Sequence, residues 1–351
     1  LSLTNNFPEF TGRLCPALCE SSCVLGINQP AVSIRNIELA IVEKAYEEGW
    51  VVARPPLKRS GKKVAIVGSG PSGLACADQL NKFGHNVEVF EKNETIGGLL
   101  ALGIPDFKLE KWVIERRVAI MQKEGIVFHV HAHVGDEISL KDLQKKYDAV
   151  VLCGGAEQPR PLNVPGAELQ GVYQAVHYLI QQNRVNAGQR IESKARMMAY
   201  GKNVIVLGGG DTGSDCVGTA NRQGAKSVKQ FEILPRPPEA RAEDNPWPQW
   251  ALIYRKSSSQ EEGVVQDYCI MTKSLSGQDG KLQKLHAVRL EYGPKDPVTG
   301  RRPMKEIPGS EFEIPCDFLV LALGFLGPVK KGLLEELPIV LDERGNVKAD
   351  E

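Results

Sequence analysis

The chain alternates between short apolar runs and longer stretches whose apolar residues recur every three or four positions. Val64–Val67 and Val204–Leu207 are apolar runs that end at a glycine, and the stretches after them keep a helical spacing to about Phe83 and Arg222. A short apolar run before a glycine is typical of a buried parallel strand, and the longer spacing is typical of an amphipathic helix. Strands that alternate with helices predict an α/β fold.

The same succession of elements occurs twice. Each repeat has an apolar strand, a G-x-G-x-x-G turn, a helix and a second strand that ends in an acidic residue. The turns begin at Gly68 and Gly208, which are 140 residues apart, and the acids are Glu91 and Glu232, which are 141 residues apart. A glycine turn between a strand and a helix, with an acid further on, is the context of a dinucleotide-binding site. The alternative is a pair of tight turns that bind no ligand.

The residue types in these turns suit the binding of a dinucleotide for physical reasons. The first glycine allows the tight turn, the second lets the backbone approach a pyrophosphate, and the third lets helix and strand pack closely. The helix N-terminus offers N–H donors to the phosphates, and the terminal acid accepts hydrogen bonds from a ribose. The motif residues predicted to bind are Gly68, Gly70, Gly73 and Glu91 in the first repeat and Gly208, Gly210, Gly213 and Glu232 in the second.

A further apolar strand closes each repeat, at Asp148–Gly155 and Asp317–Gly324. Both strands exit at a glycine, so Gly154 and Gly324 are further candidates for the two sites. Two dinucleotide sites in one chain indicate a flavin and a nicotinamide, with a hydride passing between them. This transfer depends on positioning rather than on an acid or a base, so the sequence predicts no catalytic side chain.

The composition is that of an ordinary globular protein. Of 351 residues, 42% are hydrophobic and 25% are charged, and 43 basic residues balance 43 acidic ones. This balance argues against nucleic acid or an anionic membrane as the main partner. The longest apolar run, Phe318–Leu326, is too short to span a bilayer, and no signal peptide is visible.

The eight cysteines fall into two groups. Five lie on scattered apolar stretches and predict core packing in a reducing compartment, the cytoplasm: Cys76, Cys153, Cys216, Cys269 and Cys316. Cys15, Cys19 and Cys23 instead form a regular C-x3-C-x3-C pattern. Three thiolates are too few for a four-cysteine cluster, and by themselves they are equally explained as free cysteines beside a helix.

Other segments give less specific signals. His129, His131 and His133 alternate, which predicts one polar face of a strand in preference to a metal site. The patterns elsewhere predict an amphipathic helix at 171–183, exposed turns at 257–262 and 277–281, and a pair of strands within 282–292.

The sequence leaves the nicotinamide coenzyme open. Arg236 and Arg241 follow the acid of the second repeat, and arginines in this position can bind the 2′-phosphate of NADPH. Glu232 on a free ribose diol favours NADH instead. The two arginines are equally explained as solvated loop charges.

Five segments resemble the β subunit of glutamate synthase: Asn6–Gly26, Gly68–Leu80, Glu94–Pro105, Gly208–Gly218 and Asn245–Trp250. They occur in the family's order, and the resemblance extends over nearly the whole chain. The chain is also similar to the C-terminal region of single-chain glutamate synthases and, less closely, to the flavin and nicotinamide half of dihydropyrimidine dehydrogenase. The resemblance implies two Rossmann-like domains of the flavoprotein pyridine-nucleotide reductase type. The nicotinamide domain would be inserted in the flavin domain, after a small N-terminal helical segment that contains cysteines.

The resemblance divides the chain into five parts. They are an N-terminal helical segment with part of the iron–sulfur ligands at 1–60, the first part of the FAD domain at 61–165, a linker helix at 166–200, the NAD(P)H domain at 201–326, and an incomplete return to the FAD domain at 327–351. The family carries a cysteine-rich segment further upstream and a Gly-Asp flavin segment further downstream. We therefore expect the chain to be a fragment or a processed form of a longer protein.

The resemblance implies FAD on the first repeat and NADPH or NADH on the second. The site residues that it adds to the glycines and the acids are Pro71, Ser72, Lys92, Gly97, Gly98 and Leu99 for the flavin and Asp211 and Thr212 for the nicotinamide coenzyme. Cys15, Cys19 and Cys23 would share in ligating two [4Fe–4S] clusters, for which this chain holds an incomplete ligand set.

The resemblance also implies a function. NAD(P)H would reduce FAD, and the electrons would leave through iron–sulfur clusters to the FMN of a large subunit or domain. That partner would carry the glutamine amidotransferase and form glutamate from glutamine and 2-oxoglutarate. The alternatives are an electron-input module of another iron–sulfur flavoenzyme, related to dihydropyrimidine dehydrogenase or ferredoxin–NADP reductase, or a non-catalytic nucleotide-binding scaffold. Neither nucleic acid nor a membrane is expected as a partner.

Overall fold

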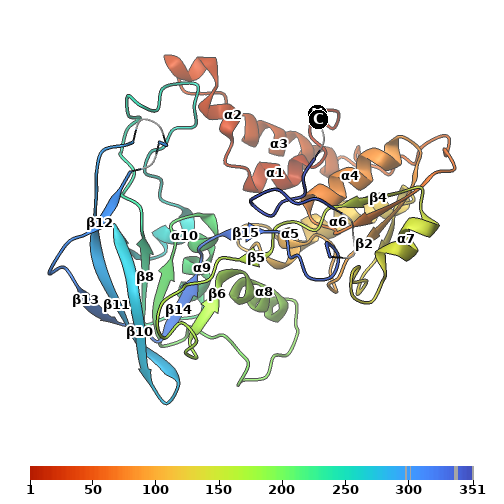
Figure 1. Ribbon diagram of the computed structural model, residues 1–351. Coiled ribbons are helices and arrows are strands. Elements are labelled where there is room, and N and C mark those ends of the chain that lie inside the picture. Colours follow the sequence, from red (N-terminus) through yellow and green to blue (C-terminus); the bar gives the residue numbers. More distant parts are fainter. Residues whose placement is uncertain (297–298, 301, 336–338, 350–351) are drawn as a thin grey trace. The chain divides into compact units, whose positions relative to one another are not determined.

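The computed structural model describes residues 1–296, 299–300, 302–335 and 339–349 (Figure 1). The chain folds as two compact units. Unit 1 comprises Leu1–Gln158, Trp247–Trp250 and Phe325–Glu351, and unit 2 comprises Pro159–Pro246 and Ala251–Gly324. The second unit is thus inserted in the first, which agrees with the predicted fold class.

The N-terminal part of unit 1 is helical, with α1 (Pro8–Leu14), α2 (Leu18–Ser21), the 3-10 helix η1 (Val24–Ile27) and α3 (Ile34–Glu47). Helices α1 and α3 pack closely, and Gly12 permits this approach: a Cβ at this position would lie only 2.7 Å from the Cβ of Leu39. The buried carboxylate of Glu9 in α1 pairs with Arg117 of α6 (Lys111–Lys123) at 2.5 Å. This ion pair attaches the N-terminal helices to the domain that follows.

That domain is a parallel sheet with the strand order β3-β2-β1-β4. Its strands are β1 (Lys63–Val67), β2 (Asn86–Phe90), β3 (Val127–His129) and β4 (Ala149–Leu152), and its helices besides α6 are α4 (Pro71–Lys82), α5 (Leu99–Leu102) and α7 (Leu140–Lys146). The strand order reverses between β1 and β4. Open α/β sheets bind ligands at the carboxyl ends of the strands at such a reversal, and the first glycine turn follows β1 at this place.

Unit 2 repeats this topology. Its parallel sheet has the order β6-β14-β7-β8-β9, from strands β6 (Val172–Gln174), β7 (Asn203–Leu207), β8 (Ser227–Glu232), β9 (Val265–Tyr268) and β14 (Phe318–Leu321). Apart from β6, the order β14-β7-β8-β9 corresponds to β4-β1-β2-β3 of unit 1. The second glycine turn follows β7, again at the reversal.

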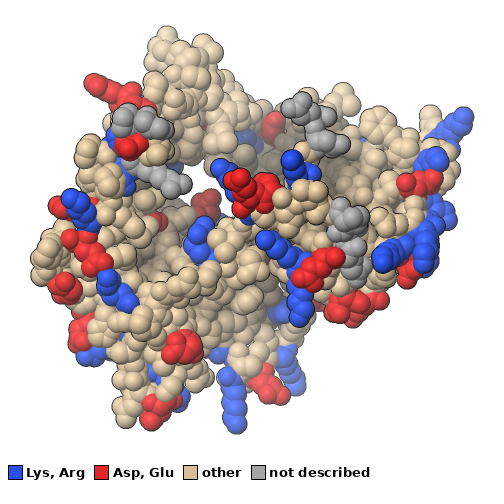
Figure 2. All heavy atoms as spheres, viewed as in Figure 1, with Lys and Arg blue, Asp and Glu red and all other residues tan. Residues whose placement is uncertain are grey.

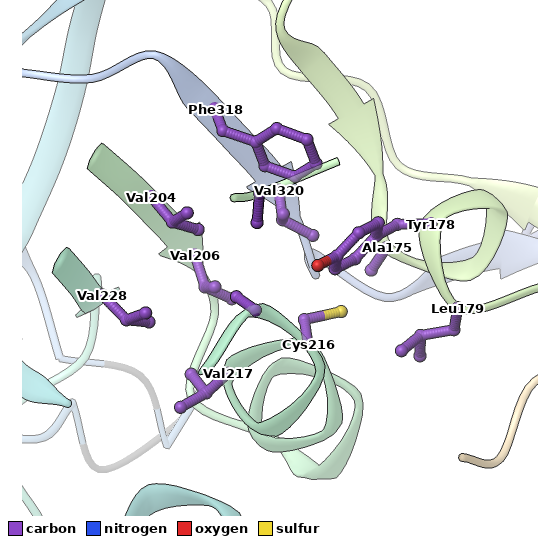
Figure 3. Packing of buried hydrophobic residues seen from close by; sticks show 12 residues of the cluster. Ala175, Tyr178, Leu179, Val204, Val206, Cys216, Val217, Val228, Phe318 and Val320 are labelled. Carbon is purple, nitrogen blue, oxygen red and sulfur yellow. The ribbon is translucent and has the colours of Figure 1, made fainter. Parts of the chain in front are cut away.

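Two different layers cover the parallel sheet of unit 2. Helices α8 (Ala175–Asn186) and α9 (Asp211–Arg222) cover one face, where Val204 and Val206 pack with Tyr178 and Cys216 (Figure 3). The alternate residues Ile205 and Leu207 pack on the other face against an antiparallel sheet. That sheet is built from β10 (Ile270–Gln278), β11 (Lys281–Tyr292), β12 (Met304–Glu306) and β13 (Phe312–Pro315). Burial on both faces explains why β7 is a continuous apolar run.

Three segments differ from their predicted structure. The stretch 282–292 belongs to one long strand, β11, which pairs with β10 across the turn at Asp279–Gly280. Residues 257–262 contain a short helix, α10 (Ser258–Glu261), which a capping box between Ser257 and Gln260 begins. The helix predicted from 171 begins only at 175, because the three residues before it join the sheet as β6.

The histidine strand is also shorter than predicted. Strand β3 ends at His129, and His131 adopts a positive φ of 51°. The three histidines therefore do not line one face of a strand. Short strands β5 (Gln158–Pro159) and β15 (Phe325–Gly327) pair where the chain enters and leaves unit 2.

Basic and acidic side chains are interspersed on the face that Figure 2 shows, as expected for a chain without net charge. Cys216 and Cys316 are buried as predicted, whereas Cys76, Cys153 and Cys269 are half-buried. None of the helices within the described ranges is long and apolar enough to cross a lipid bilayer.

Candidate functional site: two glycine cradles

The first cradle, Gly68–Gly73, joins β1 to α4. A Cβ on Gly68, which has a φ of +103°, would lie 2.4 Å from the carbonyl oxygen of Cys153, and a Cβ on Gly73 would lie 2.0 Å from the carbonyl oxygen of Gly68. The backbone itself therefore requires glycine at both positions. A Cβ on Gly70 would instead have no described atom within 4 Å. The fold therefore does not need a glycine at position 70, which is the position where the dinucleotide motif places the glycine that a pyrophosphate approaches.

The second cradle, Gly208–Gly213, joins β7 to α9 and has the same construction. A Cβ on Gly208, with a φ of +114°, would lie 2.3 Å from the carbonyl oxygen of Ala322. A Cβ on Gly213 would lie 2.3 Å from the carbonyl oxygen of Gly208, whereas a Cβ on Gly210 would meet no described atom within 4 Å. Both middle glycines thus leave space that the surrounding protein does not use.

Both helices begin without a side-chain cap from the described part of the chain, because their N-cap residues are Gly70 and Gly210. The N–H groups of a first helical turn have no partner within the helix, and together with the helix dipole they attract an anion. The first-turn residues Ser72 and Thr212 are exposed. Pro71 at the start of α4 has no N–H, and Asp211 takes the same place in α9. The open glycines and the uncapped helix ends fit the pyrophosphate of a dinucleotide.

The acid of the first repeat is buried and bonded to its own chain. Glu91 is 3% exposed and accepts hydrogen bonds from the backbone N–H and hydroxyl of Ser69 and from the backbone and side-chain amides of Asn93. The Ser69 hydroxyl also accepts from the N–H of Gly97 at 2.9 Å. The G-x-G-x-x-G motif alone does not predict this role of Ser69, although the hydroxyl at its x position is a signal for it.

The loop after Glu91 lies against the first cradle. Gly98 has φ +53° and ψ −129°, and a Cβ there would lie 2.9 Å from the Cα of Gly70. The structure therefore brings Gly97 and Gly98 next to the cradle, and the partly buried Leu99 follows them at the start of α5. Lys92 is exposed and forms an ion pair with Glu157.

Gly154 and Gly324 follow the strands that close the two repeats. Gly154 is exposed, and its Cα lies 3.3 Å from the Cβ position of Gly68, at the edge of the first cradle. Gly324 has a φ of +81°, and its carbonyl oxygen accepts from the N–H of Arg160 at 3.0 Å.

The acid of the second repeat is more open. Glu232 is half-buried, and it accepts from the backbone N–H groups of Gly209 at 2.6 Å and of Leu234 at 3.2 Å. Arg236 forms an ion pair with Glu239, and Arg241 donates to the carbonyl oxygen of Asn245 at 3.0 Å.

The cysteines of the N-terminal segment have features of metal-binding thiolates but do not make a complete site. The Sγ of Cys15 accepts from the N–H of Ala17 at 3.4 Å, and Cys19 is exposed. Backbone N–H groups of Val32 and, next, Leu25 hold the pKa of the Cys23 thiol below its ordinary value. Across the residues that the structure describes, no three His, Cys, Asp or Glu side chains gather around one ion-sized position.

Comparison with known proteins gives two family matches. The pyridine nucleotide-disulphide oxidoreductase family matches residues 62–351, and the family described as dihydropyrimidine dehydrogenase domain II, 4Fe-4S cluster, matches residues 1–50. The chain is 49% identical to the glutamate synthase [NADPH] small chain of Mycobacterium tuberculosis, over 99% of this chain and 70% of that protein. The chain belongs to the glutamate synthase small-chain family.

The chain is also similar to a much longer glutamate synthase and to a solved structure. The chain is 46% identical to the glutamate synthase [NADH] of Schizosaccharomyces pombe, over 99% of this chain and 17% of that protein. Its fold is similar to that of Mycobacterium tuberculosis FprA in complex with NADPH, with a TM-score of 0.62 and 19% identity over 85% of this chain and 76% of FprA. The predicted α/β fold of two Rossmann-like domains is confirmed, as is an oxidoreductase of the glutamate synthase family. The matches also support the predicted FAD and NAD(P)H in residues 62–351 and [4Fe–4S] clusters in residues 1–50.

Proposed function

We propose that this chain is the NAD(P)H-oxidising, FAD-dependent part of a glutamate synthase. It takes electrons from NAD(P)H and delivers them through FAD and iron–sulfur clusters to a large chain that forms glutamate from glutamine and 2-oxoglutarate. The observation that carries the proposal is the duplicated cradle. In each copy the first and third glycines are required by the fold, whereas the middle glycine faces space that only a ligand needs.

The first cradle holds FAD in this proposal. Gly68, Gly70, Pro71, Ser72 and Gly73 form the turn and helix start against the pyrophosphate, and Gly154 lies at its edge. Ser69 links the acid of this repeat to the N–H of Gly97, so the cradle and the loop at Gly97–Leu99 hold each other in place. That loop then lies beside the flavin ring. When bound, a flavin accepts a hydride from a reduced nicotinamide and releases the two electrons one at a time.

Two residues predicted to contact the flavin nucleotide, Glu91 and Lys92, already interact with other residues of the chain. Glu91 already accepts four hydrogen bonds from Ser69 and Asn93, which is about the capacity of a carboxylate. A ribose contact at Glu91 would therefore replace one of these bonds. Lys92 is engaged by Glu157, and it could reach a nucleotide only by leaving that ion pair.

The second cradle holds the nicotinamide coenzyme. Gly208, Gly210, Asp211, Thr212 and Gly213 form the pyrophosphate site through their backbone, and Gly324 lies beyond the strand that closes the repeat. The side chain of Asp211 cannot donate to a phosphate, so its contribution is its N–H group. Glu232 accepts from the ribose.

Cys15, Cys19 and Cys23 supply part of the ligands of the [4Fe–4S] clusters. The backbone N–H groups directed at Cys15 and Cys23 support this role, because such hydrogen bonds stabilise thiolates. The remaining ligands come from outside this segment.

The partner in this proposal is a large chain or domain that carries FMN and the glutamine amidotransferase, and both operate in the cytoplasm. The names of the relatives, a small chain in Mycobacterium tuberculosis and a longer glutamate synthase in yeast, support such a partner. They also favour glutamate synthase over an electron-input module of another flavoenzyme.

The test uses the complete enzyme, with its large chain, under anaerobic conditions. NADH or NADPH should bleach the flavin absorbance, and the coenzyme should be oxidised continuously, with formation of glutamate, once glutamine and 2-oxoglutarate are both present. Bleaching without glutamate would assign the chain to another flavoenzyme. Absence of flavin and of bleaching would support a nucleotide-binding scaffold instead.

A further inference from the structure

We propose that the second cradle selects NADH over NADPH and that Glu232 is the residue that selects. This inference rests on the proposed function, because it concerns the coenzyme that the second cradle binds. The sequence leaves two possibilities open. The acid at the end of β8 favours NADH, whereas the arginines that follow it can bind the 2′-phosphate of NADPH.

Glu232 is fixed in position by the backbone. One carboxylate oxygen accepts from the N–H of Gly209 inside the cradle at 2.6 Å, and the other accepts from the N–H of Leu234 at 3.2 Å. The carboxylate thus lies at the cradle itself, since a Cβ on Gly209 would be only 2.6 Å from its nearer oxygen. Rotation of the side chain away from the site would break both bonds.

The two repeats differ in how much of the acid remains available. Glu91 is 3% exposed and accepts four hydrogen bonds from its own chain. Glu232 is half-buried and accepts two among the described residues. A carboxylate accepts about four hydrogen bonds, so Glu232 retains the capacity for both hydroxyls of a ribose diol.

The same carboxylate opposes a 2′-phosphate. That phosphate would replace a hydrogen-bond donor with a dianion directly against a fixed negative charge. Like charges brought together in a partly desolvated site repel strongly.

The nearby arginines have other partners. The guanidinium of Arg236 pairs with Glu239 at 2.5 Å and stacks over the ring of Tyr254, with 4.2 Å from its central carbon to the ring centre. Arg241 donates to the carbonyl oxygen of Asn245 at 3.0 Å. A clamp on a 2′-phosphate would have to give up these interactions, whereas NADH requires no change in either arginine.

The test measures dissociation constants of NADH and NADPH for the complete enzyme, from the quenching or enhancement of nicotinamide fluorescence. The enzyme is kept anaerobic and reduced with dithionite beforehand, so that the flavin consumes neither coenzyme. We expect wild-type enzyme to bind NADH at least roughly tenfold more tightly than NADPH. Glu232→Gln keeps an acceptor for the Gly209 N–H but removes the charge, so it should weaken NADH, strengthen NADPH and bring their ratio close to one. Glu232→Ser should shift the ratio in the same direction.

Two control variants test whether the change in the ratio is specific to Glu232. Glu243→Gln removes an exposed charge from the same loop and should leave the ratio unchanged. Arg236→Ala should affect both coenzymes equally, whereas a selective loss of NADPH would identify Arg236 as a phosphate clamp. Tighter binding of NADPH to the wild type, or an unchanged ratio in Glu232→Gln, would overturn the inference and leave the proposed function intact. Binding of neither coenzyme would overturn the proposed function itself.

Discussion

Gly98 lies so close to Gly70 that a Cβ on Gly98 would be 2.9 Å from the Cα of Gly70. The two residues belong to different parts of the first repeat, the loop after its acid and the middle of its glycine turn. Because Gly98 also has φ +53° and ψ −129°, a conformation that only glycine adopts readily, the loop is built to approach the cradle. The predicted flavin loop and the predicted phosphate site are therefore one structure.

Substitution of Gly98 should disturb both stability and the cofactor. We expect Gly98→Ala to lower the free energy of unfolding by about 2–4 kcal/mol, from backbone strain and the contact with Gly70, and to release flavin. Gly26→Ala is the control, because its Cβ would make only an ordinary 3.6 Å contact with Ala31. Urea denaturation and the flavin absorbance of purified protein check both effects. A stable, flavin-replete Gly98→Ala protein would contradict this close packing.

The ion pair between Glu9 and Arg117 should be important for stability. Glu9 is fully buried and the Arg117 side chain is 13% exposed, so removal of either partner leaves an uncompensated charge. We expect Glu9→Ala or Arg117→Ala to cost about 3–5 kcal/mol and the double variant to cost much less than the sum. The exposed pair of Lys44 and Glu48 is the control, and Lys44→Ala should cost about 0.5 kcal/mol or less. Additive costs in the Glu9–Arg117 cycle would show that the pair contributes no coupling.

The thiol of Cys316 should be unreactive in the folded protein. Burial raises its pKa to about 12, so it stays protonated at pH 8, and the thiolate is the reactive form. We expect alkylation by iodoacetamide, followed by mass spectrometry, to leave Cys316 unlabelled at pH 8 and to label it fully in urea. The ordinary pKa of a cysteine, about 8.5, is restored in the unfolded chain. Equal labelling rates in folded and unfolded protein would mean that strand β14 does not shield this residue.

The sequence was sufficient to predict the fold class because its signals are local. Each cradle depends on the order strand, turn, helix and strand within a few dozen residues, and glycines mark the turns whatever the rest of the chain does. The insertion of one domain in the other followed from the resemblance to glutamate synthases rather than from the pattern.

Two elements that were predicted wrongly also carried local signals. Asp279 and Gly280 both have positive φ and connect β10 to β11, and an Asp-Gly pair between strands is a strong hairpin signal. The Ser257 to Gln260 spacing is that of a capping box and indicated the start of a helix rather than a turn. These two short signals by themselves indicate the hairpin between β10 and β11 and the start of α10.

The fold and the site contain relationships that no local pattern reveals. Glu9 lies in the first turn of a short helix near the start of the chain and pairs with an arginine 108 residues further on. Glu91 and Glu232 occupy the same place in their repeats, yet one is enclosed by Ser69 and Asn93 and the other remains half-buried. Such differences arise from tertiary packing, which brings donors to a carboxylate from separate segments.

The central claim, that each cradle binds one dinucleotide, is tested most directly by a pair of matched substitutions. Gly70→Ala and Gly210→Ala each place a methyl group in open space at a compatible backbone conformation, so neither should lower the unfolding temperature. The flavin absorbance of the complete enzyme is then followed anaerobically during titration with NADH. We predict that Gly70→Ala is purified without flavin, and that Gly210→Ala retains flavin that NADH bleaches only at far higher concentration than in the wild type. Normal flavin content in Gly70→Ala together with normal bleaching in Gly210→Ala would contradict the account.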